Sequence, residues 1–448
     1  MKEKTKIQLS DSFTYGRLLR FVVPSVLMMI FTSIYSIVDG FFVSNFVNTT
    51  AFAAVNLVMP LLMILGAVGF MIGTGGTAII AKTFGLGDKE LANRYFSFLT
   101  YFTIISGVIL AAVGIAFARP VAMLLGAAEG EMLDYCVLYA RLVLLGLPFF
   151  MLQNVFQSFF ITAEKPKFGL YVIIAAGVTN MVLDFLLVAV FEMGLAGAAL
   201  ATATSQLVGG VVPLVYFGRK NSSTLRLGKT RFYGKALLKT CTNGSSELMS
   251  NISMSIVTIF YNVQLLRFAP GNSGVAAYGV IMYVSFIFAA IFIGFVLGAS
   301  PVVSFHFGAG NKVELKSLFK KSLVIVGAAS VVMTVSSLLV AAPFSHLFVG
   351  DDPELYALTV RGFRIFSFAF LSMGINIFGS AFFTALNNGL ISAVIAFLRT
   401  LVFQIASVLI LPIFFELDGV WLSIIVSDVL SLIVTITFLA AKKKKYGY

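Results

Sequence analysis

The sequence predicts an all-α membrane protein of twelve transmembrane helices, arranged as two six-helix lobes that are related by a pseudo-twofold axis. Three observations lead to this fold class. Of the 448 residues, 59% are hydrophobic and 11% are charged, and the mean hydropathy is +1.00. Twelve long apolar stretches follow one another, and the second half repeats motifs of the first. A protein in water could not bury this much apolar surface, so the composition excludes a soluble enzyme, a disordered chain and a disulfide scaffold.

Each apolar stretch is long enough to cross the hydrocarbon core of a bilayer, which takes about 20 residues. Lipid offers no partner to an unpaired backbone group, so helices are expected, and none of the stretches alternates as a β-barrel strand would. We expect the spans near 17–45, 53–82, 95–118, 135–161, 168–191, 194–217, 236–266, 275–305, 317–342, 355–385, 389–414 and 419–441.

The basic residues predict the orientation of these spans. Most of the 31 Lys and Arg gather before the first span, after each of spans two, four, six and eight, and at the end of the chain. The first group is Lys2, Lys4, Lys6, Arg17 and Arg20. Cytoplasmic loops accumulate Lys and Arg, so we expect both termini in the cytoplasm. The net charge of +12 then needs no nucleic-acid partner.

An internal repeat divides the chain into two lobes. Three motif pairs recur in the same order at an offset of 222 or 223 residues. They are FGLGDKELANRYF from Phe84 with FGAGNKVELKSLF from Phe307, FFITA ending at Ala163 with AFFTA ending at Ala385, and GAALATATSQ from Gly197 with GVWLSIIVSD from Gly419. We expect lobes at 1–220 and 221–448, joined by a basic cytoplasmic link near 218–235. Six spans per lobe give both lobes the same orientation, which suits alternating access around a central cleft rather than a pore.

The source of energy follows by elimination. The sequence contains no G-x-x-x-x-G-K-[ST] phosphate loop and no Cys/His cluster for a metal or haem. No enzymatic activity and no cofactor are therefore expected. A carrier that does work must then use an ion gradient, with H⁺ or Na⁺ as the coupling ion. This directs attention to carboxylates inside the membrane, which are costly there and usually functional.

Two of the four acids within the spans are expected at the same depth. Asp39 in the first span and Asp184 in the fifth both lie roughly 10 Å below the outer edge, at about 1.5 Å per residue. Asn180 shares the face of Asp184 one turn deeper, and Thr202 enters from the same side. Oxygen donors of this kind suit a hard cation such as Na⁺, and two neighbouring carboxylates also suit a shared proton. The alternative is that each acid only satisfies a neighbouring helix.

The other two acids lie in the second lobe. Glu247 is near the middle of the seventh span and has no basic partner in the sequence, which favours a function over a structural role. Asp428 and Arg399 are expected near the midplane on antiparallel neighbouring spans. We interpret Asp428 and Arg399 as a structural ion pair, with a role in transport as the alternative.

Weaker signals come from single residues. Pro24 removes a backbone hydrogen bond from the first span and permits a kink there. Gln153, Asn154 and Gln157 give the fourth span a polar face, which serves either substrate or helix packing. The many Phe and Met residues could line an adaptable cavity.

Together these segments resemble the MATE (multidrug and toxic compound extrusion) family, and most closely its bacterial multidrug efflux branch. The likeness covers almost the whole chain. It rests on PSVLMMIFTSIYSIVDGFFVS in the first span, GTGGTAIIAKTFGLGDKELA after the second, the Asn180/Asp184 pair, GAALATATSQ in the sixth and Glu247 in the seventh. The resemblance implies a V of two six-helix lobes in the bacterial cytoplasmic membrane. It also implies export of organic cations in exchange for H⁺ or Na⁺.

The resemblance also implies roles for individual residues. It assigns a first-lobe cation site to Asp39, Asn180, Asp184 and Thr202, a second-lobe acid to Glu247, substrate-cavity contacts to Tyr35, Met63, Asn154 and Gln157, and the bend of the first span to Pro24. Some relatives have a further acid in the tenth span, where this sequence reads FLSMGINIFGS with Asn376. The first-lobe cluster therefore ranks above a second-lobe cation site.

The leading hypothesis is a monomeric, cation-coupled antiporter that exports amphipathic, mostly cationic drugs by alternating access. Small organic cations and the lipid bilayer are its expected partners. The runner-up is a flippase for lipid-linked oligosaccharide. Its anionic pyrophosphate would need Lys or Arg in the cleft, and the first lobe has almost none between Arg20 and Arg141 except in loops and at span ends. A channel is a third alternative, but it gives no reason for paired carboxylates inside the membrane.

Overall fold

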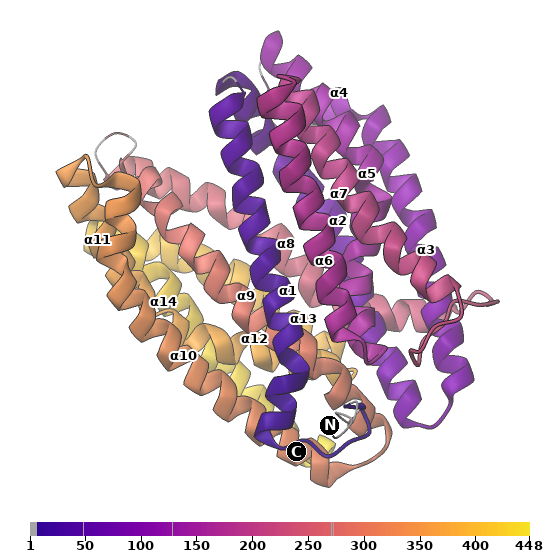
Figure 1. Ribbon diagram of the computed structural model, residues 1–448. Helices are drawn as coiled ribbons and strands as arrows, with labels where there is room; N and C mark the ends of the chain where they lie inside the picture. Colours follow the sequence, from indigo (N-terminus) through magenta and orange to yellow (C-terminus); the bar gives the residue numbers. More distant parts are fainter. Residues whose placement is uncertain (1–6, 48, 128, 270, 272) are drawn as a thin grey trace, which may run out of the picture.

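The computed structural model describes residues 7–47, 49–127, 129–269, 271 and 273–448. Lys2, Lys4 and Lys6, which contribute to the predicted orientation, lie outside the described residues. Within these ranges every regular element is a helix, so the predicted all-α fold is confirmed (Figure 1).

The first half of the chain forms six long helical segments and one short helix. They are α1 (Tyr15–Phe46), α2 (Thr49–Gly85), α3 (Lys89–Ala116), the short α4 (Ala118–Leu124), α5 (Glu131–Thr162), α6 (Pro166–Asp184) and α7 (Gly194–Gly218). The π-helix η1 (Phe185–Val190) continues α6 without a break. Pro24 lies inside α1, and the kink that it permits there stays a prediction.

The second half begins with α8 (Gly234–Phe268), α9 (Ser273–Gly308) and α10 (Lys312–Val349). The tenth span is broken into α11 (Pro353–Ser367) and α12 (Phe370–Ala385), which are bent by 47° relative to each other. The chain continues with α13 (Gly389–Phe397), the π-helix η2 (Leu398–Phe403) and α14 (Gln404–Tyr446). Inside α14, Glu416 has φ 49° and ψ −129°, which no helix allows. The chain folds back there and returns alongside η2, where the Ser427 hydroxyl donates to the Arg399 carbonyl over 3.1 Å.

The number of spans follows from these breaks. By length and composition, nine described segments could cross a membrane, or ten when α11 and α12 count as one span. The segment Gly389–Tyr446 is counted once although it turns back at Glu416, and α8 has 35 residues but a more polar composition. With these two taken into account, the twelve predicted spans are all present as helices.

The helices form two groups that lie together at one end and diverge toward the other (Figure 1). The described chain begins and ends at the joined end, which we call the terminal end. There α2 packs against α8 and α9 of the second half. Gly75 of α2 lies against the backbone of Thr240 and Gly244, and Gly85 lies against the backbone of Phe305 and Ala309. Small residues at these crossings let the helix backbones touch, as is common in membranes.

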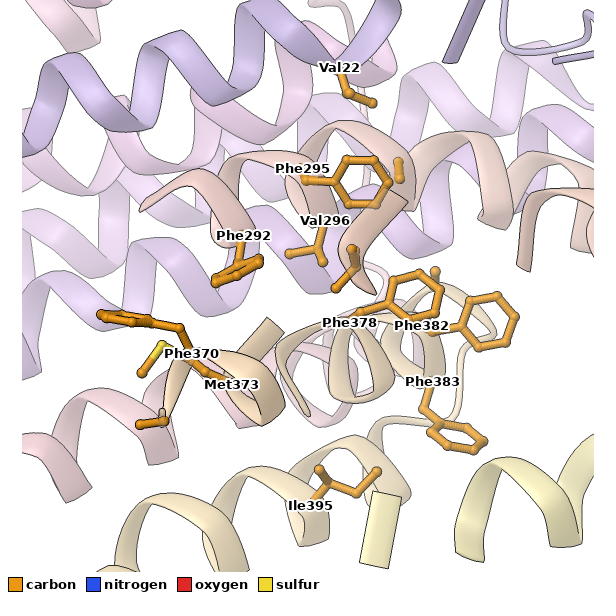
Figure 2. Close-up of a cluster of buried hydrophobic side chains, with 14 of the residues drawn as sticks. Val22, Phe292, Phe295, Val296, Phe370, Met373, Phe378, Phe382, Phe383 and Ile395 are labelled. Carbon is orange, nitrogen blue, oxygen red and sulfur yellow. The ribbon is translucent and has the colours of Figure 1, made fainter. Parts of the chain in front are cut away.

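Each group of helices has its own apolar core. Figure 2 shows the core of the second half, where Phe292 of α9 lies near Phe370 and Met373 of α12. Val22 of α1 joins this core although it belongs to the first half of the chain. Two further clusters lie in the first half, between α2, α5 and their neighbours. The helix α1 thus packs against α6 on one side and α9 on the other. The division into lobes at 1–220 and 221–448 stays a prediction.

Candidate cation and substrate sites

Four polar side chains from three helices meet inside the first half. They are Asp39 of α1, Asn180 and Asp184 of α6, and Thr202 of α7. The Thr202 hydroxyl donates to Asp39 Oδ1 over 3.4 Å, and Asp184 and Asn180 are the other neighbours of the Asp39 carboxyl in this cluster. Asp184 is fully buried, and Asn180 is 1% exposed. The structure therefore brings together all four residues of the predicted cation site.

The buried acceptors of this cluster lack donors. Both carboxylate oxygens of Asp184 and the side-chain oxygen of Asn180 have no hydrogen-bond partner among the described residues. A buried acceptor without a donor costs about 1–3 kcal/mol, and an unpaired buried charge costs more. Two facing carboxyls can relieve this cost by sharing a proton or by holding a cation between them. The cluster therefore has the chemistry of a proton or cation site.

The local backbone explains how these residues meet. Asn180 and Asp184 are four residues apart on α6, so they share one face. Asp184 is the last residue before η1, and π-helical turns change the direction in which side chains leave a helix. Gly177 brings α1 close, because a Cβ there would lie 2.5 Å from Phe31 Cε1 and 2.9 Å from Tyr35 Cδ1. The absence of a side chain at Gly177 is thus what lets α1 approach α6.

A cavity of about 130 Å³ lies next to the cluster. Its lining includes Asp39, Asn180 and Thr202 of the predicted cation site, and Tyr35 and Met63 of the predicted substrate cavity. One water occupies about 30 Å³ of liquid volume, so this cavity has room for an ion with a few waters and not for a drug-sized molecule.

The other two predicted cavity residues lie elsewhere. Asn154 is buried in α5, and its amide donates to the Gly66 carbonyl of α2 over 3.4 Å. Gln157, one turn further, is also buried, and neither residue lines the cavity. The contact of Asn154 with α2 matches the helix-packing alternative that the sequence left open, and the role of Gln157 stays a prediction.

Sequence reasoning missed several residues of this cavity, and two of them have large polar side chains. Tyr139 of α5 and Gln206 of α7 both line it. The repeat contained a signal for Gln206, because it aligns this residue with Asp428. Tyr139 gave no signal, since it resembles any aromatic residue of an apolar span. Next to the cavity, the Gln153 amide donates to the Tyr35 hydroxyl over 3.5 Å and so links α5 to α1.

A second and larger cavity, of about 620 Å³, lies in the second half. Glu247 of α8 and Asn376 of α12 line it, together with Arg399 of η2 and Asp428 of α14. Arg399 Nε donates to Asp428 Oδ1 over 2.9 Å, so the two form the expected ion pair. The Asn376 amide donates to the Asp428 carbonyl over 2.8 Å. The carboxylate of Glu247 receives no hydrogen bond that the described structure records.

Twelve helical spans in two groups, with acidic side chains lining a cavity in each group, are the architecture of a multi-pass membrane transport protein. The chain belongs to the MatE family, whose model matches residues 24–186 and again 248–410. The two matches fall one in each half of the chain, in the same order as the internal repeat.

Related proteins resemble the chain over nearly its whole length. It is 24% identical to "Multidrug export protein MepA" of Staphylococcus haemolyticus, over 96% of this chain and 94% of the relative. It is 25% identical to the protein of the same name from Staphylococcus saprophyticus, over 94% of this chain and 91% of the relative. The fold matches a structure described as the outward-facing conformation of a multidrug resistance MATE family transporter, with a TM-score of 0.92 and 21% identity over 100% of this chain and 99% of that one.

Proposed function

We propose that this protein exports amphipathic, mostly cationic drugs across the bacterial plasma membrane in exchange for H⁺ or Na⁺. The observation that carries the proposal is the buried cluster in which Asp184 and Asn180 present three acceptor oxygens without a donor. A lone structural carboxyl would be expected to find a donor among its neighbours. The names of the MepA relatives, "Multidrug export protein", support the drug side of the exchange.

The orientation and the transport cycle are part of the same proposal. The excess of Lys and Arg in the loops at the terminal end supports a cytoplasmic location for that end and both termini. The two halves diverge at the opposite end, so the described arrangement corresponds to an outward-facing state (Figure 1). Transport would require the two lobes, 1–220 and 221–448, to part at the terminal end and to meet at the other. A monomer suffices for this cycle, because one chain supplies both lobes.

The ion acts as a second substrate in this scheme. When H⁺ or Na⁺ reaches Asp39 and Asp184, it removes the cost of the unpaired carboxylate charge. The ion therefore stabilises the state in which the cluster is complete, and the imposed gradient drives the cycle in one direction. Both ions fit the donor set of two carboxyls, one amide and one hydroxyl.

The first cavity does not suit the anionic group of the flippase alternative, whereas the larger cavity contains Arg399. The lining of the first cavity contains no Lys or Arg among the residues that the structure describes, although a pyrophosphate group would need such a partner. The carboxyl of Asp39 in the same lining would repel an anion.

Drug efflux from proteoliposomes tests the proposal, with a pH gradient and a Na⁺ gradient imposed separately. Asp39→Asn and Asp184→Asn should each abolish gradient-driven ethidium efflux without lowering the yield of folded protein. Asp134→Asn is the matched control, because Asp134 is exposed in the first turn of α5 and should leave efflux unchanged. Wild-type efflux in the Asp39 and Asp184 variants would refute the coupling mechanism.

A further inference from the structure

The two cavities described above differ in size, and this difference determines which ligand each can hold. Binding sites for drug-sized molecules usually occupy about 300–1,000 Å³. The cavity of about 620 Å³ in the second half falls in this range, whereas the cavity of about 130 Å³ beside Asp39 does not. An organic ligand therefore fits the second half in the described state.

The lining of the larger cavity is suited to an amphipathic molecule. Apolar and sulfur-containing side chains cover most of it, among them Met254, Met282 and Met373. Methionine is flexible and polarisable, and adapts to ligands of varied shape. Charged groups are few: Glu247, Arg399 and Asp428 are the only acidic or basic residues in the described lining.

Arg399 keeps most of its hydrogen-bonding capacity within this lining. A guanidinium has five N–H donors, and the described contacts use only the one on Nε, toward Asp428. The side chain of Arg399 is 19% exposed, while that of Asp428 is 3% exposed and lies behind it. A purely structural Arg–Asp pair in low dielectric would gain from bidentate contact. Here the two terminal nitrogens of Arg399 remain available to a ligand in the cavity.

Glu247 supplies the opposite charge. Glu247 borders the cavity, and the hydrogen bond that the described structure records at this residue goes to its backbone carbonyl, not to its carboxylate. The cavity thus presents one acceptor for a cation and, separately, a planar donor pair for an anion.

We propose that the second-half cavity binds amphipathic ligands that carry both an amine and an anionic group, with Glu247 holding the amine and the terminal nitrogens of Arg399 holding the anion. The proposal assigns a zwitterionic substrate class to the exporter. That these ligands are transported rests on the proposed function. Binding itself does not depend on ion coupling, so it is measured in purified protein without a gradient.

The test uses two matched fluorescent probes. Nα-dansyl-lysine carries an amine and a carboxylate, and dansylcadaverine is the same molecule without the carboxylate. Trp421, the sole tryptophan of the sequence, lies in α14 beside the cavity-lining helix face that bears Ile424, so energy transfer from tryptophan to dansyl reports binding. The wild-type protein should bind Nα-dansyl-lysine about tenfold more tightly than dansylcadaverine. Equal affinities, or no binding of either probe, would overturn the proposal.

Variants assign the preference to residues. Replacing Arg399→Gln and Asp428→Asn together keeps a neutral hydrogen-bonded pair and should reduce the tenfold preference to about one, while the affinity for dansylcadaverine stays within twofold. Glu247→Gln should weaken both probes by a similar factor. A preference that persists in the double variant would exclude Arg399 as the anion partner. Asp134→Asn, far from the cavity in sequence and exposed, is the control for purification and labelling.

The same chemistry occurs in the headgroup of phosphatidylethanolamine. Adding this lipid to the detergent-solubilised protein distinguishes the sources: displacement of Nα-dansyl-lysine indicates a lipid ligand, and retention indicates a free amphipath. Failure of the export assay with an intact probe preference would contradict the proposed function and leave this site standing. The reverse result would contradict only the site.

Discussion

The joined terminal end gives the sharpest prediction about the transport cycle. Gly244 of α8 packs directly on the backbone of Met71 in α2. A Cβ at position 244 would lie 2.7 Å from the Met71 carbonyl carbon and 2.9 Å from its Cα, whereas ordinary contact begins at 3.4 Å. These are backbone atoms, which cannot rotate away, so Gly244→Ala requires the two helices to separate by about 0.7 Å or more.

The size of the effect follows from the cost of overpacking. One extra carbon in a packed interface costs about 1–3 kcal/mol. The higher helix propensity of Ala acts equally on the joined and the parted state, because α8 is helical in both, and therefore cancels. A bias of about 1–3 kcal/mol shifts a two-state equilibrium by roughly 5- to 150-fold. Gly244→Ala should accordingly populate a state that is open at the terminal end.

Spin-label distances across the terminal end measure this shift. Leu86, just after α2, and Val313, at the start of α10, are 66% and 83% exposed, so both accept a label without disturbing packing. Cys136 and Cys241 are first replaced by Ala, so that only the two introduced cysteines carry labels. In lipid nanodiscs, Gly244→Ala should transfer population to a longer distance. Gly327→Ala in α10 is the control, because a Cβ there meets nothing within 4 Å. Identical distance distributions in wild type and Gly244→Ala would refute the reasoning, as would an equal shift in Gly327→Ala.

Three further predictions concern single contacts. Glu314→Ala removes the acceptor of the buried Phe13 amide, whose hydrogen bond is 2.8 Å long. The free energy of unfolding should fall by about 1–3 kcal/mol in a thermal-denaturation assay. The control is Lys316→Ala, at an exposed position, for which no loss is expected. Arg399→Gln alone leaves Asp428 buried without a cationic partner and should lower the free energy of unfolding by about 3–5 kcal/mol. Arg399→Gln combined with Asp428→Asn should recover most of this stability. A double variant less stable than the single one would contradict the prediction. Gly177→Ala pushes α1 away from α6 and should weaken ion-dependent efflux. The control is Gly16→Ala, because a Cβ at that position meets nothing within 4 Å. Equal efflux in the two variants would show that the close approach of α1 and α6 is dispensable.

Much of the fold was predictable because membrane-spanning helices can be recognised in a sequence by their length and apolar composition. The expected turn between 414 and 419 coincides with the break at Glu416. The break between α11 and α12 was not predictable, since the sequence around Phe368 contains neither Pro nor Gly and reads as one apolar span. The same holds for η1, because a π-helical turn depends on how α6 packs rather than on residue type.

The candidate sites were predictable where an acidic residue lies inside a span, because burying its charge is costly, and where its depth in the membrane can be counted from the end of the span. Asp39 and Asp184 met because two acids at one depth in neighbouring spans have few other places to go. Asn154 and Gln157 were harder to place, because α5 is buried on nearly every face and periodicity then selects no single one. The size of the second cavity could not be predicted from the sequence. It depends on how seven elements of the second half pack around a shared space, together with Asn56 of α2.

The repeat shows how the two halves have come to differ. At the offset of 222 residues, Asn180 corresponds to Val402, Asp184 to Ala406 and Thr202 to Ile424. The second half thus lacks these three oxygen donors of the first-half cluster, and Ile424 instead lines the larger cavity.

An ion beside Asp184 and an organic ligand beside Arg399 could not compete for the same atoms. Their coupling would have to pass between the halves, and two helices are placed to carry it: α2, which lines both cavities and packs on α8 and α9, and α1. The helix α1 holds Asp39 at the first-half cluster, packs along α6, and contributes Val22 to the core around α9. Because α9 also lines the larger cavity, a shift of α1 on ion binding would change the walls of both cavities at once.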